Sequence, residues 1–146
     1  MANLKEYRQK RQFNITSEPK GKVIKKAMPI FVVQKHSARN LHYDFRLQME
    51  GVLKSFAVPK QPPLKANIKR LAIETEDHPM AYAEFEGNIP KGEYGAGTVE
   101  IWDKGEYKLI EQSKKAIKFE LFGNKMKGIY VLVNLKNKNW LLFKTL

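Results

Sequence analysis

No cysteine occurs in the 146 residues of this chain. Its absence excludes disulfide bonds, thiolate zinc sites and cysteine nucleophiles, and it agrees with a reducing compartment. Long apolar runs are also missing: IYVLVNL at 129–135 is too short to span a bilayer, and the N-terminal MANLKEYRQKRQFN lacks the apolar core of a signal peptide. We therefore expect a cytoplasmic, nucleoid-associated protein with no membrane partner, and a monomer for want of any contrary signal.

Acidic residues are scarce. The chain has 15 Asp and Glu against 27 Lys and Arg, a formal net charge of +12. Such an excess favours a polyanionic partner, most often nucleic acid, although a basic surface without a dedicated partner has the same composition. The 42% content of hydrophobic residues is ordinary for a globular protein of one domain.

Short segments rich in β-branched and aromatic residues predict a mainly β protein, a compact closed or nearly closed β-barrel with short helices. The predicted strands are 29–34, 41–49, 53–59, 70–76, 98–103, 106–111, 116–122, 129–135 and 140–146. Turns are predicted at 50–51, 103–105, 123–124 and 137–139. We divide the chain into an N-terminal arm, 1–27, packing on or near the functional site, and a single barrel domain, 28–146.

The segment LHYDFRL at 41–47 alternates between apolar and polar residues, as a strand with two unlike faces does. Its odd positions are predicted to pack in the core: Leu41, Tyr43, Phe45 and Leu47. The even positions, His42, Asp44 and Arg46, then share the other face, about 6.6 Å apart in succession. His42 and Asp44 can share one ion, while Arg46 reaches a group bound beside it. Because this face is not the core, we expect the fold to survive replacement of His42 or Asp44 by alanine.

His36 precedes His42 by six residues, across SARN, which can turn the chain so that both histidines meet the same ion. Two imidazoles and a carboxylate suit Mn²⁺, Fe²⁺ or Zn²⁺ and leave positions for water or substrate. The alternative is an exposed polar strand face with incidental histidines.

The third histidine lies in LAIETEDHPMAY at 71–82. Leu71, Ile73 and Thr75 are predicted on one face of this strand, with Glu74, Glu76 and His78 on the other. If the strand neighbours 41–49, all three histidines converge. His78 could then donate a proton or bind an anion beside Tyr82, and Glu76 could orient a metal-bound histidine.

This set of side chains favours metal-assisted hydrolysis of a phosphate ester, with Arg46 gripping phosphate oxygens and His78 stabilising charge or protonating the leaving group. Lys60 and Arg70, which flank the proline-rich loop at 60–67, are candidate phosphate contacts. Two alternatives stay open. Two histidines and a carboxylate also form the facial triad of non-haem Fe(II) oxygenases. A non-catalytic nucleic-acid-binding barrel is the other, although Tyr43 and Phe45 are predicted in the core rather than exposed for base stacking.

Four segments closely resemble the 3′-phosphoesterase domain of bacterial DNA ligase D, a domain that also occurs free-standing: QKHSARNLHYDFRL, SFAVPK, EDHPMAYAEFEGNIPKGEYGAGTVEIWDKG and WLLFK. The resemblance runs from about Tyr7 to the C-terminus. It implies a β-barrel with a basic groove and a Mn²⁺-dependent enzyme, with Co²⁺ or Zn²⁺ possible in the same site. The implied activity removes a 3′-terminal ribonucleoside from DNA and then the 3′-phosphate, leaving a 3′-hydroxyl for repair by non-homologous end joining. Any ligase and polymerase partners are expected to be separate proteins.

The resemblance also implies roles for individual residues. It makes His36, His42 and Asp44 the metal ligands, Arg46 and His78 the phosphate-binding pair, and Tyr82 a neighbouring catalytic residue. Supporting positions are implied for Gln34, Lys60, Arg70, Glu76, Arg11 and Glu18. Gln12 stands where the family usually has aspartate, a departure that bears on the diesterase step.

Overall fold

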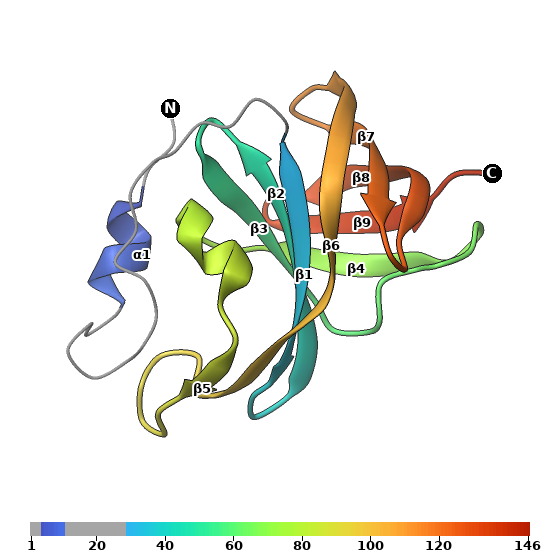
Figure 1. Ribbon diagram of the computed structural model, residues 1–146. Helices are drawn as coiled ribbons and strands as arrows, with labels where there is room; N and C mark the ends of the chain where they lie inside the picture. The colour runs from blue at the N-terminus through green and yellow to red at the C-terminus, as the bar shows by residue number, and fades with distance from the viewer. Residues whose placement is uncertain (1–3, 11–28) are drawn as a thin grey trace.

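The computed structural model describes residues 4–10 and 29–146. These residues form a short α-helix, a short 3₁₀ helix and nine strands (Figure 1). The helical segments are α1 (Lys5–Gln9) and η1 (Met80–Glu84). The strands are β1 (Ile30–Ser37), β2 (Leu41–Met49), β3 (Val52–Val58), β4 (Lys69–Glu74), β5 (Gly87–Ile89), β6 (Gly97–Gln112), β7 (Ala116–Gly123), β8 (Lys127–Lys136) and β9 (Asn139–Lys144).

Eight of these strands close into an antiparallel barrel. The order runs β1-β2-β3-β4-β9-β8-β7-β6, and β6 pairs back to β1 and completes the ring. The short β5 pairs with the start of β6 outside the ring. The prediction of a mainly β protein with a closed barrel is therefore confirmed. No helix in the described part of the chain is both long and apolar enough to cross a membrane.

The strand β6 corrects one sequence prediction, because it runs unbroken through the turn expected at 103–105. Gly105 lies against β7, where a Cβ atom would overlap the carbonyl oxygen of Phe122. The pairing of β6 with β1 shifts register between Val33 and Gln34. This β-bulge bends β6 without ending it. The glycine thus permits close approach of two strands rather than a turn.

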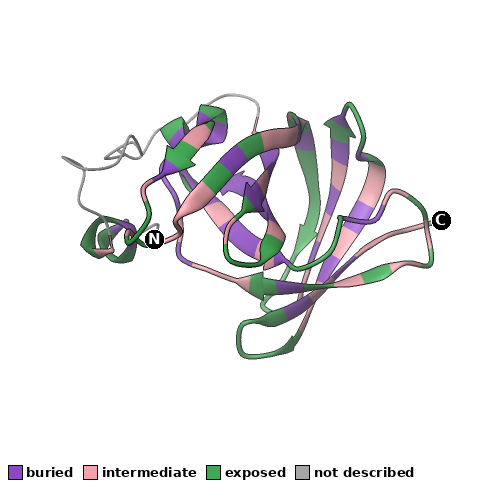
Figure 2. Cartoon of the chain, turned by 90° about the horizontal axis from the view of Figure 1, so that it is seen from below, coloured by how far each residue is buried: buried purple, intermediate pink, exposed green. Residues whose placement is uncertain are grey.

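Alternation along the strands separates an inner from an outer face, visible as bands of buried and exposed residues in Figure 2. Tyr43, Phe45 and Leu47 of β2 point into the barrel core as predicted, together with side chains from β1, β3 and β4 and from β6 to β9. Leu41 departs from the prediction, since it is 49% exposed beside the turn of the β1–β2 hairpin, where it pairs with Ser37.

A second apolar cluster lies on the outer face of β1, β3 and β6. It joins Tyr7 of α1 to side chains of η1 and β5 and to residues on the strands themselves. Figure 1 shows α1 and η1 on this side of the barrel. The polar face of β2 therefore lies between the barrel wall and a cover of short segments, and it is not a solvated face.

The strand β4 ends at Glu74, two residues earlier than predicted, so Glu76 and His78 do not continue its alternation. It pairs with β3 and β9 rather than with β2. His78 is placed instead by an isolated bridge to Leu53 of β3, in which the two backbones exchange hydrogen bonds of 2.7 and 2.9 Å. The histidine still reaches the polar face of β2, by this route.

Candidate active site

The β1–β2 hairpin brings two histidines together. His36 and His42 are direct partners in the antiparallel register, so their side chains project from the same face, with ring centroids 4.7 Å apart. Asp44, two residues along β2, shares that face. Its Oδ2 atom lies 3.5 Å from His36 Nδ1 and 3.3 Å from His42 Nε2. One potential ligand atom from each of the three residues lies within 4.8 Å of the other two.

Backbone carbonyl groups fix which histidine nitrogens face this centre. His36 Nε2 lies 2.7 Å from the carbonyl oxygen of Gly95, and His42 Nδ1 lies 3.2 Å from that of Asn40. A carbonyl oxygen only accepts, so these nitrogens donate, and in each neutral ring the nitrogen facing Asp44 holds the lone pair. Such an outer hydrogen bond is typical of metal-binding histidines. The donor set thus fits a divalent metal ion held by His36, His42 and Asp44.

The charge of Asp44 is stabilised inside the protein. Burial opposes its ionisation, but the positive charge of Arg46 and the hydrogen bonds that the two histidine rings donate when protonated hold the pKa of the carboxyl group well below its usual range. The hydrogen bond from the protonated His42 ring to Asp44 in turn raises the pKa of His42, against the effect of burial. The site therefore presents an ionised carboxylate at neutral pH.

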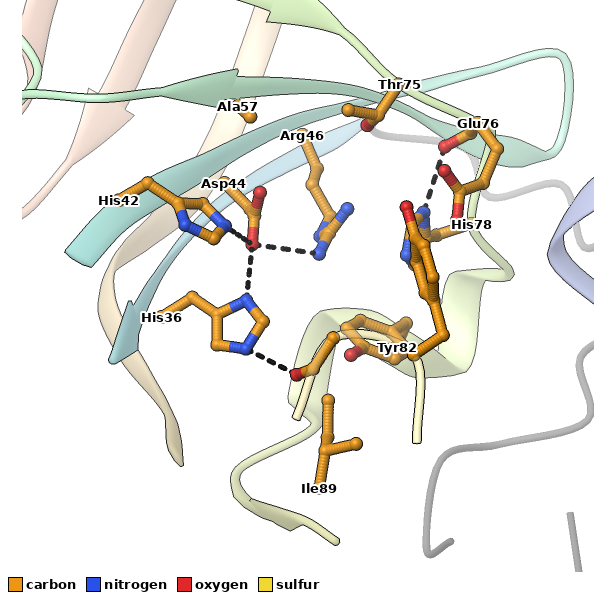
Figure 3. A pocket seen from close by; sticks show the side chains of 12 residues that line it. His36, His42, Asp44, Arg46, Ala57, Thr75, Glu76, His78, Tyr82 and Ile89 are labelled. Carbon is orange, nitrogen blue, oxygen red and sulfur yellow. Dashed lines mark hydrogen bonds and ion pairs between the residues drawn. The ribbon is translucent and has the colours of Figure 1, made fainter. Parts of the chain in front are cut away.

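Arg46 is held by neutral partners on the neighbouring strands. Its Nε donates to Gln34 Oε1 at 2.7 Å, and one terminal nitrogen donates to Ser55 Oγ at 2.9 Å. Its other terminal nitrogen lies 3.6 Å from Asp44 Oδ2. Figure 3 shows the guanidinium group projecting between Asp44 and His78. Arg46 can thus present a positive charge to an anion in the cavity.

Gln34 links this wall to the cover above it. Its Nε2 atom donates to the carbonyl oxygens of Tyr82 and Phe85, at 2.7 and 3.1 Å. The predicted supporting residue Gln34 therefore holds both Arg46 and the end of η1.

His78 stands across the cavity between two tyrosine rings. Tyr82 and Tyr7 contact it edge-on, with centroids 4.8 and 5.0 Å away. Its Nδ1 atom lies 3.0 Å from the carbonyl oxygen of Glu76 and donates to it, which leaves proton exchange to Nε2. The Arg46 guanidinium group lies over the Tyr82 ring, with its Cζ atom 4.9 Å from the ring centroid.

These side chains enclose a cavity of about 340 Å³. We call His36, His42 and Asp44 the metal-type cluster. Figure 3 shows this cluster on one wall of the cavity and His78 and Tyr82 on the other. The lining residues are His36, His42, Asp44, Arg46, Ala57, Thr75, Glu76, His78, Tyr82, Ile89, Tyr94 and Gly95. All three histidines converge here, as the sequence pattern suggested.

Two predicted phosphate contacts lie elsewhere. Lys60 and Arg70 line a separate depression with Pro59, Lys69 and Leu71, and Arg70 Nε donates to the carbonyl oxygen of Gln61. Arg11 and Glu18 fall outside the described residues, as does Gln12. The division into an arm of 1–27 and a domain of 28–146 likewise stays a prediction.

Several residues that build the site were not predicted from the sequence. Tyr7 comes from α1, Lys10 follows directly after α1, Ser55 comes from β3, and Tyr94 and Gly95 come from the glycine-rich loop after β5. For the loop a signal existed, since four glycines and a proline in 86–97 are typical of a backbone that approaches a ligand. For Tyr7 there was none, because its burial depends on contact with a distant segment.

Comparison with known proteins agrees with this geometry. Residues 34–134 match the family model of the DNA ligase D 3′-phosphoesterase domain. The chain is 45% identical over 153 aligned positions to the multifunctional non-homologous end joining protein LigD of Pseudomonas aeruginosa, covering 97% of this chain and 18% of that protein. It is 47% identical to the protein of the same name from Mycolicibacterium smegmatis, covering 92% and 19% respectively.

The chain thus spans about a fifth of the length of these curated relatives. The matched region contains the metal-type cluster, Arg46, His78 and Tyr82. This chain belongs to the DNA ligase D 3′-phosphoesterase domain family.

Proposed function

We propose that this chain is a manganese-dependent phosphoesterase that heals DNA 3′ ends. It removes a 3′-terminal ribonucleoside by hydrolysis of the phosphodiester bond, and then removes the 3′-phosphate to leave a 3′-hydroxyl. The observation that carries the proposal is one cavity holding a His-His-Asp cluster, an arginine and a third histidine. Family membership supports the same reaction class.

The metal ion would be held by His36, His42 and Asp44. Their nitrogen and oxygen donors suit Mn²⁺, and Co²⁺ or Zn²⁺ can take the same set. When bound, such an ion polarises the phosphoryl group and lowers the pKa of a water molecule. Asp44 meets the need for a charged ligand, because Arg46 keeps its carboxyl group ionised.

Arg46 binds the phosphate group in this proposal. The bonds to Gln34 and Ser55 hold its guanidinium plane, so little side-chain entropy is lost when an anion binds. An arginine paired with a phosphate oxygen stabilises the charge that develops there in the transition state. Its burial strengthens the interaction, since little water screens it.

His78 is the proton donor. In the diesterase step the oxygen of a water molecule bonds to phosphorus, the water releases one proton to solvent, and the bond from phosphorus to the 5′-oxygen of the terminal nucleoside breaks. That leaving oxygen takes a proton from His78 Nε2, whose orientation is set by the Nδ1 contact to Glu76. In the monoesterase step the 3′-oxygen of the primer leaves in the same way. Tyr82, against both His78 and Arg46, positions them and hydrogen-bonds the phosphate.

The partner is a DNA 3′ end in a primer–template duplex, drawn to a chain of net charge +12. The relatives are named as multifunctional non-homologous end joining proteins, and we propose that ligase and polymerase proteins act as partners of this chain on the same DNA ends. We place the monomeric protein in the cytoplasm, associated with the nucleoid. Lys60, Arg70, Arg11 and Glu18 keep their proposed supporting roles along the DNA.

A gel assay tests the proposal. One 5′-labelled primer ends in a ribonucleoside and another in a 3′-phosphate, each annealed to a longer template, with Mn²⁺ or with EDTA. Conversion of both, only with metal, supports both steps, whereas conversion of the phosphate-ended primer alone restricts the chain to a 3′-phosphatase. No conversion by folded protein contradicts the proposal and favours the oxygenase or non-catalytic alternatives.

The variant His42→Ala tests whether the metal-type cluster is needed for hydrolysis. The variant loses one of three donors, so we expect Mn²⁺ affinity to fall at least tenfold and hydrolysis to become undetectable. Leu41→Ala, an exposed neighbour on the same strand, serves as the control. Near-normal hydrolysis by His42→Ala, with calorimetry showing intact Mn²⁺ binding, contradicts the metal assignment.

A further inference from the structure

Tyr94 differs from the other aromatic residues that line the cavity. Its side chain comes from the glycine-rich loop between β5 and β6 and is 50% exposed, whereas Tyr82 and His78 are buried. A large ring kept half in water beside a polar cavity has little value for packing. Half of its surface faces solvent at the edge of the cavity.

The backbone of this loop is tied to the metal-type cluster. Gly95 adopts φ +77°, a conformation that glycine takes without strain, and its carbonyl oxygen accepts the hydrogen bond from His36 Nε2. Tyr94 is the preceding residue. Its ring therefore stands at a fixed offset from the position where the phosphate would bind.

Lys10, the residue directly after α1, restrains the ring itself. Its ammonium group donates to the Tyr94 hydroxyl at 3.2 Å, lies 4.5 Å from the ring centroid, and pairs with the buried Glu76 carboxylate at 3.1 Å. A ring held in this way loses less entropy when a flat ligand binds than a freely rotating one does.

We infer that Tyr94 is a stacking platform for the base of the 3′-terminal nucleoside, the one that leaves in the diesterase step. The inference rests on the proposed function, since it names how that site would hold its leaving group. A terminal base has a stacking neighbour on one side only. Its other face can meet an aromatic ring without unstacking the duplex, whereas interior bases have no open face.

The chemistry of the platform sets its specificity. Every base has a π-face, so stacking tolerates any sequence, and larger purines gain more contact than pyrimidines. Only a substrate that carries a base beyond the scissile phosphate can use the ring. Tyr94 therefore discriminates the diester from the 3′-phosphate monoester, which has no base beyond the phosphate.

The first test is equilibrium binding without hydrolysis. Labelled primer–template with EDTA is titrated with wild-type protein, Tyr94→Ala and Tyr94→Phe, using a terminal adenosine or a terminal ribose that has no base. We expect wild type and Tyr94→Phe to bind the adenosine end about tenfold more tightly than the baseless end, the size of one base–aromatic stack. For Tyr94→Ala the ratio falls to about one.

The second test is the ratio of kcat/KM values on the same two substrates with Mn²⁺. We expect this ratio to change in parallel with the binding ratio, because stacking acts on KM. A structural role of the loop would instead lower the rates on both substrates. If Tyr94→Ala lowers both rates equally by displacing Gly95 and His36, or if the ratio does not change, the inference is overturned. A wild-type protein that binds both ends but hydrolyses neither contradicts the proposed function, while the binding ratio still decides the role of Tyr94.

Discussion

Asp44 and Arg46 carry opposite charges in the interior, with only 8% and 3% of their surfaces exposed. Alternation along β2 correctly predicted which face they share, but the expectation that this face lies outside the core is wrong, because η1, β5 and Tyr7 cover it. A single strand cannot reveal what packs over it. Replacement of Asp44 by alanine therefore affects stability as well as metal binding.

Arg46→Ala tests how far this charge pair stabilises the fold. The variant leaves Asp44 buried without its main counter-charge and leaves Gln34 and Ser55 without their donor. Removing one partner of a buried pair costs about 3–5 kcal/mol of unfolding free energy, measurable by denaturant titration. Since the donors to a metal remain, Mn²⁺ should still bind and restore part of the loss, while hydrolysis disappears.

Arg39→Ala is the matched control for Arg46→Ala, because it removes the same charge from an exposed position between β1 and β2. We expect its stability to lie within about 0.5 kcal/mol of wild type. Equal stability of the two variants, or loss of Mn²⁺ binding in Arg46→Ala, contradicts this account of Arg46.

The strand β6 carries a buried carboxylate that shapes the next hairpin. Asp103 accepts hydrogen bonds from the backbone N–H groups of Asn124, Lys125 and Met126, at 2.8, 3.2 and 2.8 Å. Gly123 stands where a Cβ atom would overlap the Asp103 carboxylate. This aspartate, read in the sequence as part of a turn of its own, instead fixes the turn between β7 and β8.

Asp103→Ala should therefore loosen that turn. Hydrogen bonds to a charged group contribute about 1.5–3 kcal/mol each, and water can replace part of the loss, so we expect about 3 kcal/mol lower unfolding free energy. The cavity is built from other elements, so activity per folded molecule is retained. Glu100→Ala, an exposed carboxylate on the same strand, is the control. An unchanged denaturation midpoint for Asp103→Ala contradicts the role of this residue.

The elements that the sequence predicted best are those set by local periodicity. The β1–β2 hairpin, and with it the pairing of His36 and His42, follows from alternation and from the SARN turn. The cover does not, because η1 is held by the Gln34 side chain, and β5 lies within a segment rich in glycine. Contacts between distant segments, which short-range patterns cannot encode, complete the site.

The whole molecule combines two apolar clusters on opposite sides of one wall. The barrel interior supports the inner faces of β1, β3 and β6, and the outer cluster supports their outer faces. Polar side chains inside the outer cluster are tolerated because each is satisfied: among the described residues, no buried side-chain nitrogen or oxygen lacks a hydrogen-bond partner. A site built in this way depends on the closed barrel for its geometry.

Two buried tyrosine hydroxyl groups bond to backbone carbonyl groups, one on β2 and one in the loop between β3 and β4, and they make the stability of the barrel sensitive to alkaline pH. Tyr107 donates to the carbonyl oxygen of Gln48 at 2.6 Å, and Tyr130 to that of Pro63 at 2.8 Å. Burial raises the pKa of each to about 12, from an ordinary value of 10.0. Below pH 10 both hydroxyl groups are protonated in the folded and in the unfolded protein, so their full contribution to stability is present there. Above it the unfolded chain loses these protons first, and stability falls up to pH 12.

Each tyrosine contributes at most about 1.4 kcal/mol per pH unit to this fall, the linkage of one proton. Denaturant titrations across the interval should show a smaller slope in Tyr107→Phe and in Tyr130→Phe, and the smallest in the double variant. The lysine side chains are the same in wild type and in the three variants, so their contribution to the slope cancels in the comparison. Slopes that match wild type in both single variants would mean that these hydroxyl groups ionise as easily in the barrel as in water, and that their hydrogen bonds to Gln48 and Pro63 do not protect them from ionisation.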